Sequence, residues 1–374
     1  MKANFPMRQP PEEPHRPRTR QIVRAARMAL YPRHAESTRS KLDRLVLYAR
    51  SHARALILTH DNPDPDSIAS GVALAYILQK LAGVEAIVAF GGIVGRAENR
   101  ALLRVLKLPV VPVARVVFDD YDLICMVDTQ PEQGNHSLPA RHFPDVVIDH
   151  HPERPDSHLA PIADVGGPIG ATSTVVAEYF RASGLKVPTQ VATALFYGIK
   201  ADTRDLGRQT TKQDVDTYLW LYPLVDKDAL AEIEHPKLPD DYFRLYHTAI
   251  ERARVVGDAV ICDLAEIYAP DMVAEVAERF SFLEDMKWSL AFGEYEESVF
   301  FSLRTSDRRM NAGRLIREVI EAKGGSAGGH GTMAGARISV KGLSAAARKR
   351  LCEEIVRSFL DAFGVKARKP KKLV

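Results

Sequence analysis

Apolar runs of strand length alternate with amphipathic helical stretches through the first two hundred residues. Apolar residues fill most positions of the runs at 55–60, 85–92, 121–128 and 144–151, which predicts strands buried on both faces. Helical spacing of apolar residues predicts helices at 36–52, 67–83, 97–107, 170–184 and 188–202. Strands that alternate with helices in this way form a parallel sheet covered by helices on both faces. We therefore expect an α/β domain here.

The pattern changes after residue 210, where two helical stretches follow with a proline-containing hinge at 235–241. Strands are then predicted at 258–267, 288–306 and 335–342, and helices at 312–325 and 344–364. This is the pattern of a smaller α+β domain, which we expect to face the first domain across a cleft. The expected organisation is a basic flexible extension (1–36), the α/β domain (37–234), a linker (235–245), the α+β domain (246–365) and a basic tail (366–374).

Charge and cysteine content add little to this picture except at the chain ends. The formal net charge is only +3, which excludes a histone-like polycation, but residues 1–34 hold eight Lys or Arg and two Glu. We expect both basic ends to be mobile, and either contact with nucleic acid or acidic lipid or a purely solubilising role stays open. The three cysteines form no CxxC pair and predict free thiols in a reducing cytosol.

Membrane and secretory signals are missing from the sequence. The apolar, uncharged stretch 67–78 falls short of the ~20 residues that span a bilayer. The N-terminus has no apolar signal core. We expect a cytoplasmic protein with no membrane partner.

Acidic and histidine side chains follow the predicted strands, at the points where the strands end. Because the carboxyl ends of parallel strands meet at one edge of a sheet, these side chains should converge. The residues are His60, Asp64, Asp66, Asp128, Asp149, His150, His151 and, after the helix at 188–202, Asp202.

Such a cluster needs cations, because carboxylates held together raise one another's pKa. Residues 62–67 alone could be a proline turn with a helix cap at Asp66 or Ser67, but the four stretches in order favour a metal site. Two divalent cations would balance four carboxylates. Carboxylates with imidazole and no thiolate favour Mn²⁺, with Mg²⁺ as the second choice.

Five motifs carry a resemblance to a known family. HDNPDPDSIASG (60–71), VDTQP (127–131), IDHHP (148–152) and GIKADT (198–203) resemble, in order, the four motifs of the DHH phosphoesterase family. GGHGTMAGARI (328–338) is similar to the glycine-rich signature of the DHH-associated C-terminal domain, except that Ala327 replaces the first glycine. The resemblance covers residues 50–340, and the departure at Ala327 concerns substrate fit more than the metal site.

The resemblance implies a division of labour among the site residues. A first metal ion would be held by His60, Asp64 and Asp128, and a second by Asp66, Asp128, His150 and Asp202. His151 would face the substrate phosphate as electrostatic stabiliser or proton donor, and Asp149 would orient the histidine pair. Substrate would contact His330, Gly328, Gly329, Arg304 and Arg314. Arg204 and Arg208 are expected to be exposed loop residues, with phosphate contact as the alternative. Thr172 and Ser173 are expected to cap a helix.

The resemblance is greatest to the short members that degrade nanoRNA from the 3′ end and often dephosphorylate 3′-phosphoadenosine 5′-phosphate. We therefore expect a manganese-dependent phosphoesterase whose partners are short oligoribonucleotides or mono- and dinucleotides. Hydrolysis of cyclic or linear dinucleotides is the alternative within the same chemistry. Inorganic pyrophosphatases share the metal motifs, but the Gly-Gly-His signature favours a nucleotide. A regulatory module that binds nucleotide or nucleic acid is the non-enzymatic alternative, and a homodimer stays open.

Overall fold

The computed structural model describes residues 37–365 and 369–374, with the side chain of His330 excepted. The predicted extension at 1–36 therefore lies outside the described residues. Two compact units make up the chain, and each is described by itself. The first holds most of the chain up to Asp226, and the second holds Lys227–Val374 with the short stretches 62–64 and 92–108. The predicted domain boundaries, 37–234 and 246–365, stay predictions.

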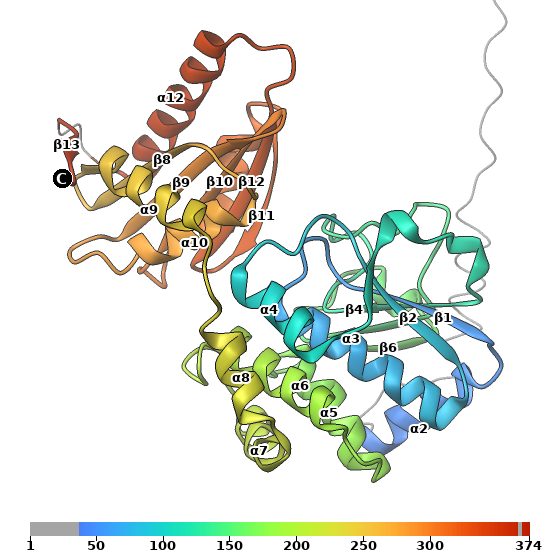
Figure 1. Ribbon diagram of the computed structural model, residues 1–374. Coiled ribbons are helices and arrows are strands. Elements are labelled where there is room, and N and C mark those ends of the chain that lie inside the picture. Colours follow the sequence, from blue (N-terminus) through green and yellow to red (C-terminus); the bar gives the residue numbers. More distant parts are fainter. Residues whose placement is uncertain (1–36, 366–368) are drawn as a thin grey trace, which may run out of the picture. The chain divides into compact units, whose positions relative to one another are not determined.

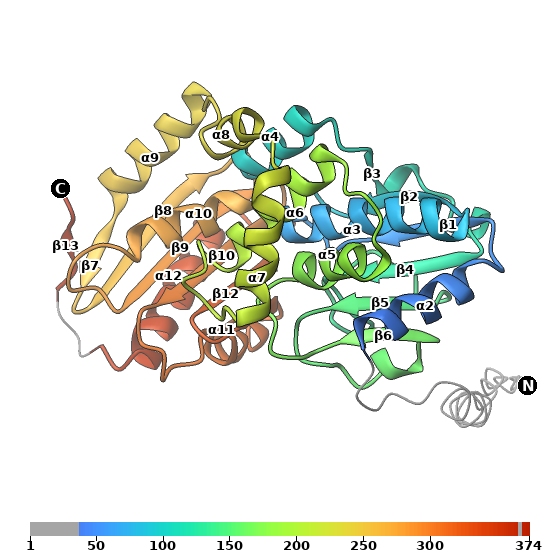
Figure 2. The ribbon, with the colours of Figure 1, turned by 90° about the horizontal axis from the view of Figure 1, so that it is seen from below.

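A six-stranded sheet forms the centre of the first unit, in the order β3-β2-β1-β4-β5-β6 (Figure 2). All five strand pairs are parallel, which confirms the predicted α/β class. The strands are β1 (Arg54–Leu58), β2 (Glu85–Phe90), β3 (Val110–Pro112), β4 (Leu123–Val127), β5 (Val146–Asp149) and β6 (Ile162–Val165). The helices are α2 (Thr38–Ala49), α3 (Pro65–Ile77), α5 (Thr172–Ser183), α6 (Thr189–Asp202) and α7 (Lys212–Leu221), with shorter helical turns η1 (Leu78–Ala82), η2 (Val113–Arg115), η3 (Phe118–Asp120), η4 (Ser157–Leu159) and η5 (Tyr222–Leu224).

Alternation along β1 assigns its side chains to two faces of the sheet. Ile57 points toward α3, where Gly71 permits close packing: a Cβ atom on Gly71 would lie 2.9 Å from Cγ1 of Val88. Leu56 and Leu58 point to the other face and pack against the segment 111–121, which contains η2 and η3. Helical elements therefore flank both faces of the sheet.

A seven-stranded sheet forms the centre of the second unit, in the order β11-β12-β10-β9-β8-β7-β13 (Figure 1). The pairs are antiparallel except for β8 with β9. The strands are β7 (Arg254–Val256), β8 (Ala259–Glu266), β9 (Trp288–Tyr295), β10 (Ser298–Thr305), β11 (Ser326–His330), β12 (Met333–Ser339) and β13 (Lys371–Lys372). The helices are α4 (Ala97–Leu106), α8 (Lys227–Glu234), α9 (Asp240–Arg252), α10 (Asp271–Phe280), α11 (Ala312–Glu321) and α12 (Ala345–Ala362).

Two apolar clusters cover the two faces of this second sheet. One joins Leu290 and Phe301 of the sheet to Ile316 of α11 and Phe359 of α12. The other joins the sheet to α9 and α10. The unit is thus the mixed sheet-and-helix domain that the sequence predicts.

The C-terminal segment differs from the expected mobile tail. Residues 371–372 form β13, which pairs with Val255 and Arg254 of β7, and Leu373 packs against the cluster of α9 and α10. Two exposed lysines therefore form a short edge strand. None of the helices that the structure describes is long and apolar enough to cross a membrane.

Candidate metal centre

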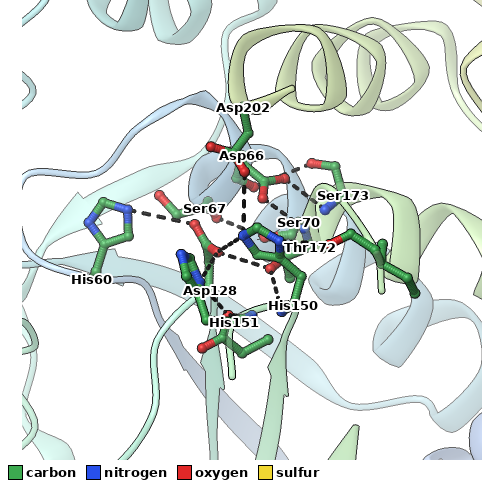
Figure 3. Close-up of polar contacts among 12 residues, drawn as sticks. His60, Asp66, Ser67, Ser70, Asp128, His150, His151, Thr172, Ser173 and Asp202 are labelled. Atoms are coloured by element: carbon green, nitrogen blue, oxygen red, sulfur yellow. Dashed lines mark hydrogen bonds and ion pairs between the residues drawn. The ribbon is translucent and has the colours of Figure 1, made fainter. Parts of the chain in front are cut away.

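The carboxyl ends of β1, β4 and β5 bring the predicted histidine and acidic residues together (Figure 3). His60 comes two residues after β1, Asp128 directly follows β4, and Asp149 is the last residue of β5. These three strands are neighbours and parallel, so their ends lie at one edge. Asp128 has a φ of 56°, a left-handed conformation that is rare outside glycine and that is often found at functional sites.

The N-terminus of α5 fixes one of the carboxylates. Asp66 is buried, and its two carboxylate oxygens accept hydrogen bonds of 2.7 Å from the backbone N–H groups of Thr172 and Ser173. The Thr172 hydroxyl donates to Oδ1 of Asp128 at 2.9 Å. The partial positive charge of a helix N-terminus favours such carboxylates. The segment at the start of α5 therefore supports two of the acids at once.

Three overlapping groups of side chains present their ligand atoms within 4.8 Å of one another. The imidazole Nε2 of His150 lies 3.7 Å from Asp128 Oδ1 and 3.3 Å from Asp202 Oδ2. Nε2 of His60 lies 3.7 Å from the other oxygen of Asp128. Asp128 and His150 thus each belong to two groups. The groups are His60, Asp64 and Asp128; Asp66, His150 and Asp202; and Asp128, Asp149, His150 and His151.

The two imidazoles are oriented as metal ligands require. Nδ1 of His150 lies 3.1 Å from the Ile169 carbonyl oxygen, and Nδ1 of His60 lies 2.9 Å from the Asp61 carbonyl oxygen. Each contact makes Nδ1 the donor and leaves a lone pair on Nε2. Nε2 of His150 is buried and has no hydrogen-bond partner among the described residues. A divalent cation would satisfy this nitrogen, and the oxygen and imidazole donors suit such an ion.

His151 belongs to a separate hydrogen-bond chain. Its Nδ1 donates to Oδ1 of Asp149 at 2.8 Å, and its backbone N–H donates to the same oxygen at 3.0 Å. The other Asp149 oxygen accepts from the side chain of Gln130 at 2.7 Å. Burial opposes ionisation of Asp149, but the bonds from His151 and Gln130 outweigh it and lower the pKa of this carboxyl.

The same pair shifts the pKa of His151 in the opposite direction. Burial disfavours the imidazolium of His151, but the hydrogen bond and charge of Asp149, with the charges of Asp202 and Asp66, more than offset this and raise the pKa of the imidazole. The Asp149–His151 pair thus favours a cationic imidazole beside the acidic cluster.

The sequence predicts that Arg208 is exposed in its loop, but in the structure its side chain is half-buried beside Asp202. Its guanidinium donates to Oδ1 of Asp202 at 3.0 Å and to the Asp202 carbonyl oxygen at 2.6 Å. The loop also holds left-handed backbone at Arg204, Asp205, Leu206 and Gln209. This turn returns Arg208 to the end of α6, while Arg204 is exposed as expected.

The predicted substrate residues lie in the second unit. Arg304, on β10, is half-buried and donates to the hydroxyl of Ser302 and to backbone carbonyl groups. Arg314 is exposed on α11 and pairs with Glu318. Gly328 and Gly329 are on β11, and only Gly329 requires glycine, since its φ is 136°. The backbone of His330 pairs with Met333, and its side chain lies outside the described residues.

The sequence did not reveal the groups that hold the ligands in place. Its pattern gives Thr172 and Ser173 only the role of capping a helix, which is wrong: Ala171 is the N-cap residue of α5, without a side-chain hydrogen bond, and Thr172 and Ser173 are the first two residues of the helix. The pattern gives Gln130 no role at all. Gln130 is fully buried and also accepts from the hydroxyl of Ser157 at 2.7 Å. A glutamine two residues after an acid at the end of an apolar strand is the signal that could have indicated this role.

Family models match both units. The model of the DHH family, N-terminal domain, matches residues 54–199, and that of the DHHA1 domain matches residues 257–357. The chain therefore belongs to the DHH family and carries a DHHA1 domain. The resemblance seen in the five sequence motifs is confirmed.

Individual relatives share these domains. An uncharacterised protein of Methanocaldococcus jannaschii is 33% identical over 322 residues, which cover 84% of this chain and 65% of the relative. A probable manganese-dependent inorganic pyrophosphatase of Lactiplantibacillus plantarum is 27% identical over 177 residues, covering 47% of this chain and 57% of the relative. The chain thus spans less than two thirds of the length of either relative.

A solved structure supports the fold as a whole. An exopolyphosphatase-related protein from Bacteroides fragilis superposes with a TM-score of 0.66, at 16% sequence identity, covering 85% of this chain and 96% of the other. At this identity the likeness concerns the fold alone.

Proposed function

We propose that this protein is a metal-dependent phosphoesterase that removes nucleotides from the 3′ end of very short RNA. The observation that carries the proposal is the position of Asp128, one carboxylate oxygen of which lies 3.7 Å from Nε2 of His60 and the other 3.7 Å from Nε2 of His150. A carboxylate shared in this way supports two neighbouring cations. Mn²⁺ is the proposed ion because imidazole accompanies the carboxylates, and Mg²⁺ is the second choice.

The residues of the site have distinct proposed roles. His60, Asp64 and Asp128 would hold one ion, and Asp66, Asp128, His150 and Asp202 would hold the other. Divalent cations bound there would supply Lewis-acid chemistry, polarising the phosphoryl group and acidifying water enough for attack near neutral pH.

His151 and Arg208 act on the substrate in this proposal. The imidazolium of His151, held by Asp149, stabilises charge on the phosphoryl oxygens or donates a proton to the leaving oxygen. Arg208, beside Asp202, adds a second positive charge for an anionic substrate.

The DHHA1 domain supports a nucleotide as the substrate. β11 lies at an edge of its sheet and has no further strand beside it among the described residues, and the carbonyl oxygen of Gly329 accepts a hydrogen bond of 3.3 Å from Arg317. A Cβ atom on Gly328 would meet nothing within 4 Å, so the approach to this strand is open. We propose that this edge, with His330, Arg304 and Arg314, binds a base or a phosphate away from the scissile bond. 3′-Phosphoadenosine 5′-phosphate is a further substrate within the same proposal.

Other substrates are favoured by particular observations. The relative from Lactiplantibacillus plantarum carries the name of a probable manganese-dependent inorganic pyrophosphatase, which makes pyrophosphate the second candidate. Cyclic or linear dinucleotides fit the same chemistry. A nucleotide-binding regulatory module is the non-enzymatic candidate.

One substrate panel tests these candidates together. Purified protein with Mn²⁺ is given di- to pentaribonucleotides, 3′-phosphoadenosine 5′-phosphate, cyclic dinucleotides and pyrophosphate, with a chelator as the control. The proposal expects the highest kcat/KM on the short oligoribonucleotides, with mononucleotides released from the 3′ end. Turnover of pyrophosphate alone would favour the second candidate, and binding without turnover would favour the regulatory module.

A further inference from the structure

Asp214 is a fully buried carboxylate outside the candidate metal centre. It lies in the first turn of α7, and four neutral donors surround it. Its Oδ2 accepts from the backbone N–H of Gly170 at 2.9 Å and from the N–H and hydroxyl of Thr211 at 2.8 and 2.7 Å. Its Oδ1 accepts from the hydroxyl of Thr174 at 2.6 Å. Burying a charge in this way is costly unless the bonds are all made.

Half of these contacts have a local explanation. Thr211 is the N-cap of α7, and Thr211 with Asp214 forms a capping box, which stabilises the start of the helix. The contacts with Gly170 and Thr174 are different, because these residues lie just before and within the first turn of α5, 44 and 40 residues earlier in the chain.

The short segment 169–173 contacts the proposed metal ligands; Gly170 lies within it and Thr174 directly follows it. This segment gives the carbonyl contact of Ile169 to His150 and the two N–H bonds from Thr172 and Ser173 to Asp66. It also gives the hydroxyl bond to Asp128. Asp214 therefore accepts hydrogen bonds from Gly170 and Thr174, and so holds in place a segment that contacts three of the proposed ligands.

The close approach of Gly170 indicates that this contact is built into the fold. A Cβ atom there would lie 3.0 Å from Oδ2 of Asp214 and 2.8 Å from Cγ2 of Thr203. A larger residue would force the segment away from Asp214.

We infer that Asp214 is a positioning residue of the metal centre, which acts through the segment 169–173 and touches neither metal nor substrate. The inference rests on the proposed function in that it takes His150, Asp66 and Asp128 as metal ligands. Loss of the carboxylate would leave the segment free to move, and the three ligands would then lose their fixed orientation.

The test measures Mn²⁺ binding to the metal-free protein by calorimetry or electron paramagnetic resonance, which needs no substrate. Asp214→Asn should weaken Mn²⁺ binding by about 10–100-fold, the usual range for partners that orient ligands. Thr174→Val, which removes one bond to the segment, should weaken it less but in the same direction. Excess Mn²⁺ should restore part of the lost kcat in both variants.

Two control variants separate positioning from helix stability. Asp216→Asn changes an acid on the same helix that pairs with Lys212 and should leave Mn²⁺ affinity unchanged. Thr211→Ala removes the N-cap but keeps the bonds to Gly170 and Thr174, so it should lower the melting temperature without a matching loss of Mn²⁺ affinity.

The outcomes distinguish this inference from the proposed function. Unchanged Mn²⁺ affinity in Asp214→Asn overturns the inference, as do equal losses in Thr211→Ala and Asp214→Asn. If Asp214→Asn does not fold, unchanged affinity in Thr174→Val overturns it. If the wild-type protein binds no Mn²⁺, both the proposed function and this inference are contradicted.

Discussion

His151 illustrates how one side chain can be set apart from the ligands that surround it. Its Nδ1 is 2.8 Å from Asp149 and 3.6 Å from Asp128, so its nearest acidic partner is outside the proposed ligand set. Asp149 in turn is fully buried and held by Gln130. The arrangement suits a histidine that serves the substrate while its neighbour His150 serves the metal.

This division predicts the behaviour of His151→Ala. The variant should keep most of its bound Mn²⁺, because His60, His150 and the carboxylates remain. It should lose about 10²–10³ in kcat, the usual scale for one transition-state donor. Mass spectrometry measures the bound Mn²⁺, and steady-state kinetics measures kcat. Loss of metal in parallel with kcat would make His151 a ligand.

A second prediction at this scale concerns Arg208. Arg208→Gln should raise KM for a dinucleotide about tenfold, the loss of one charge-assisted hydrogen bond, because the guanidinium beside Asp202 attracts the anionic substrate. Arg204→Gln is the matched control, since Arg204 lies in the same loop and is exposed. Equal KM values in the two variants would show that only the general charge of the loop matters.

At the scale of elements, the site depends on how closely α6 passes α3 and α5. A Cβ atom on Gly198 of α6 would lie 2.4 Å from the Ser173 hydroxyl oxygen and 3.2 Å from Cα of Asp66. Glycine therefore lets three helix segments meet beside the ligands.

Gly198→Ala should consequently destabilise the protein. Overpacking costs about 1–3 kcal/mol in the free energy of unfolding, and the better helix propensity of alanine returns about 1 kcal/mol. Urea denaturation should show a net loss, and Ser173→Ala in the same chain should recover part of it by removing the nearest clashing atom. A net gain from Gly198→Ala alone would contradict the packing argument.

Much of the fold and of the ligand set could be predicted from the sequence, because long apolar runs define strands and acids at strand ends define a shared edge. The apolar pattern does not predict the strands β3 and β6, since they have three and four residues and are mostly half-buried. One strand predicted at 288–306 is two, because the chain turns at Glu296, whose φ is 54°. β11 was missed because its glycines give no strand signal.

The supporting contacts could not be predicted for a different reason. Thr172 and Ser173 bond to an acid more than 100 residues earlier in the chain, and they use backbone N–H groups of a kind that nearly every residue has. Asp214 has the signature of an ordinary capping box, which hides its contact with Gly170. Such contacts arise from tertiary packing and leave no periodic pattern.

At the scale of the whole molecule, net positive charge is concentrated at the N-terminal end of the sequence. Deletion of residues 1–34, with eight Lys or Arg and two Glu, should weaken binding of a single-stranded RNA of about 20 nucleotides. The steepness of log K against log salt should fall by about 0.7 for each phosphate that the extension neutralises. Hydrolysis of a dinucleotide should not change, since so short a ligand needs only the metal centre and the DHHA1 domain. An unchanged salt dependence would assign the extension a purely solubilising role.

The central claim is that Asp128 joins two cations in one hydrolytic centre, and Asp128→Ala tests it most directly. The measurement is the rate of Mn²⁺-dependent hydrolysis of a diribonucleotide. The control is Asp119→Ala, which changes an exposed acid of the same unit that pairs with Arg141. Asp128→Ala should abolish hydrolysis, because both proposed ligand sets lose the carboxylate that lies between His60 and His150, while Asp119→Ala should retain hydrolysis. Turnover at the wild-type rate in Asp128→Ala would contradict the account.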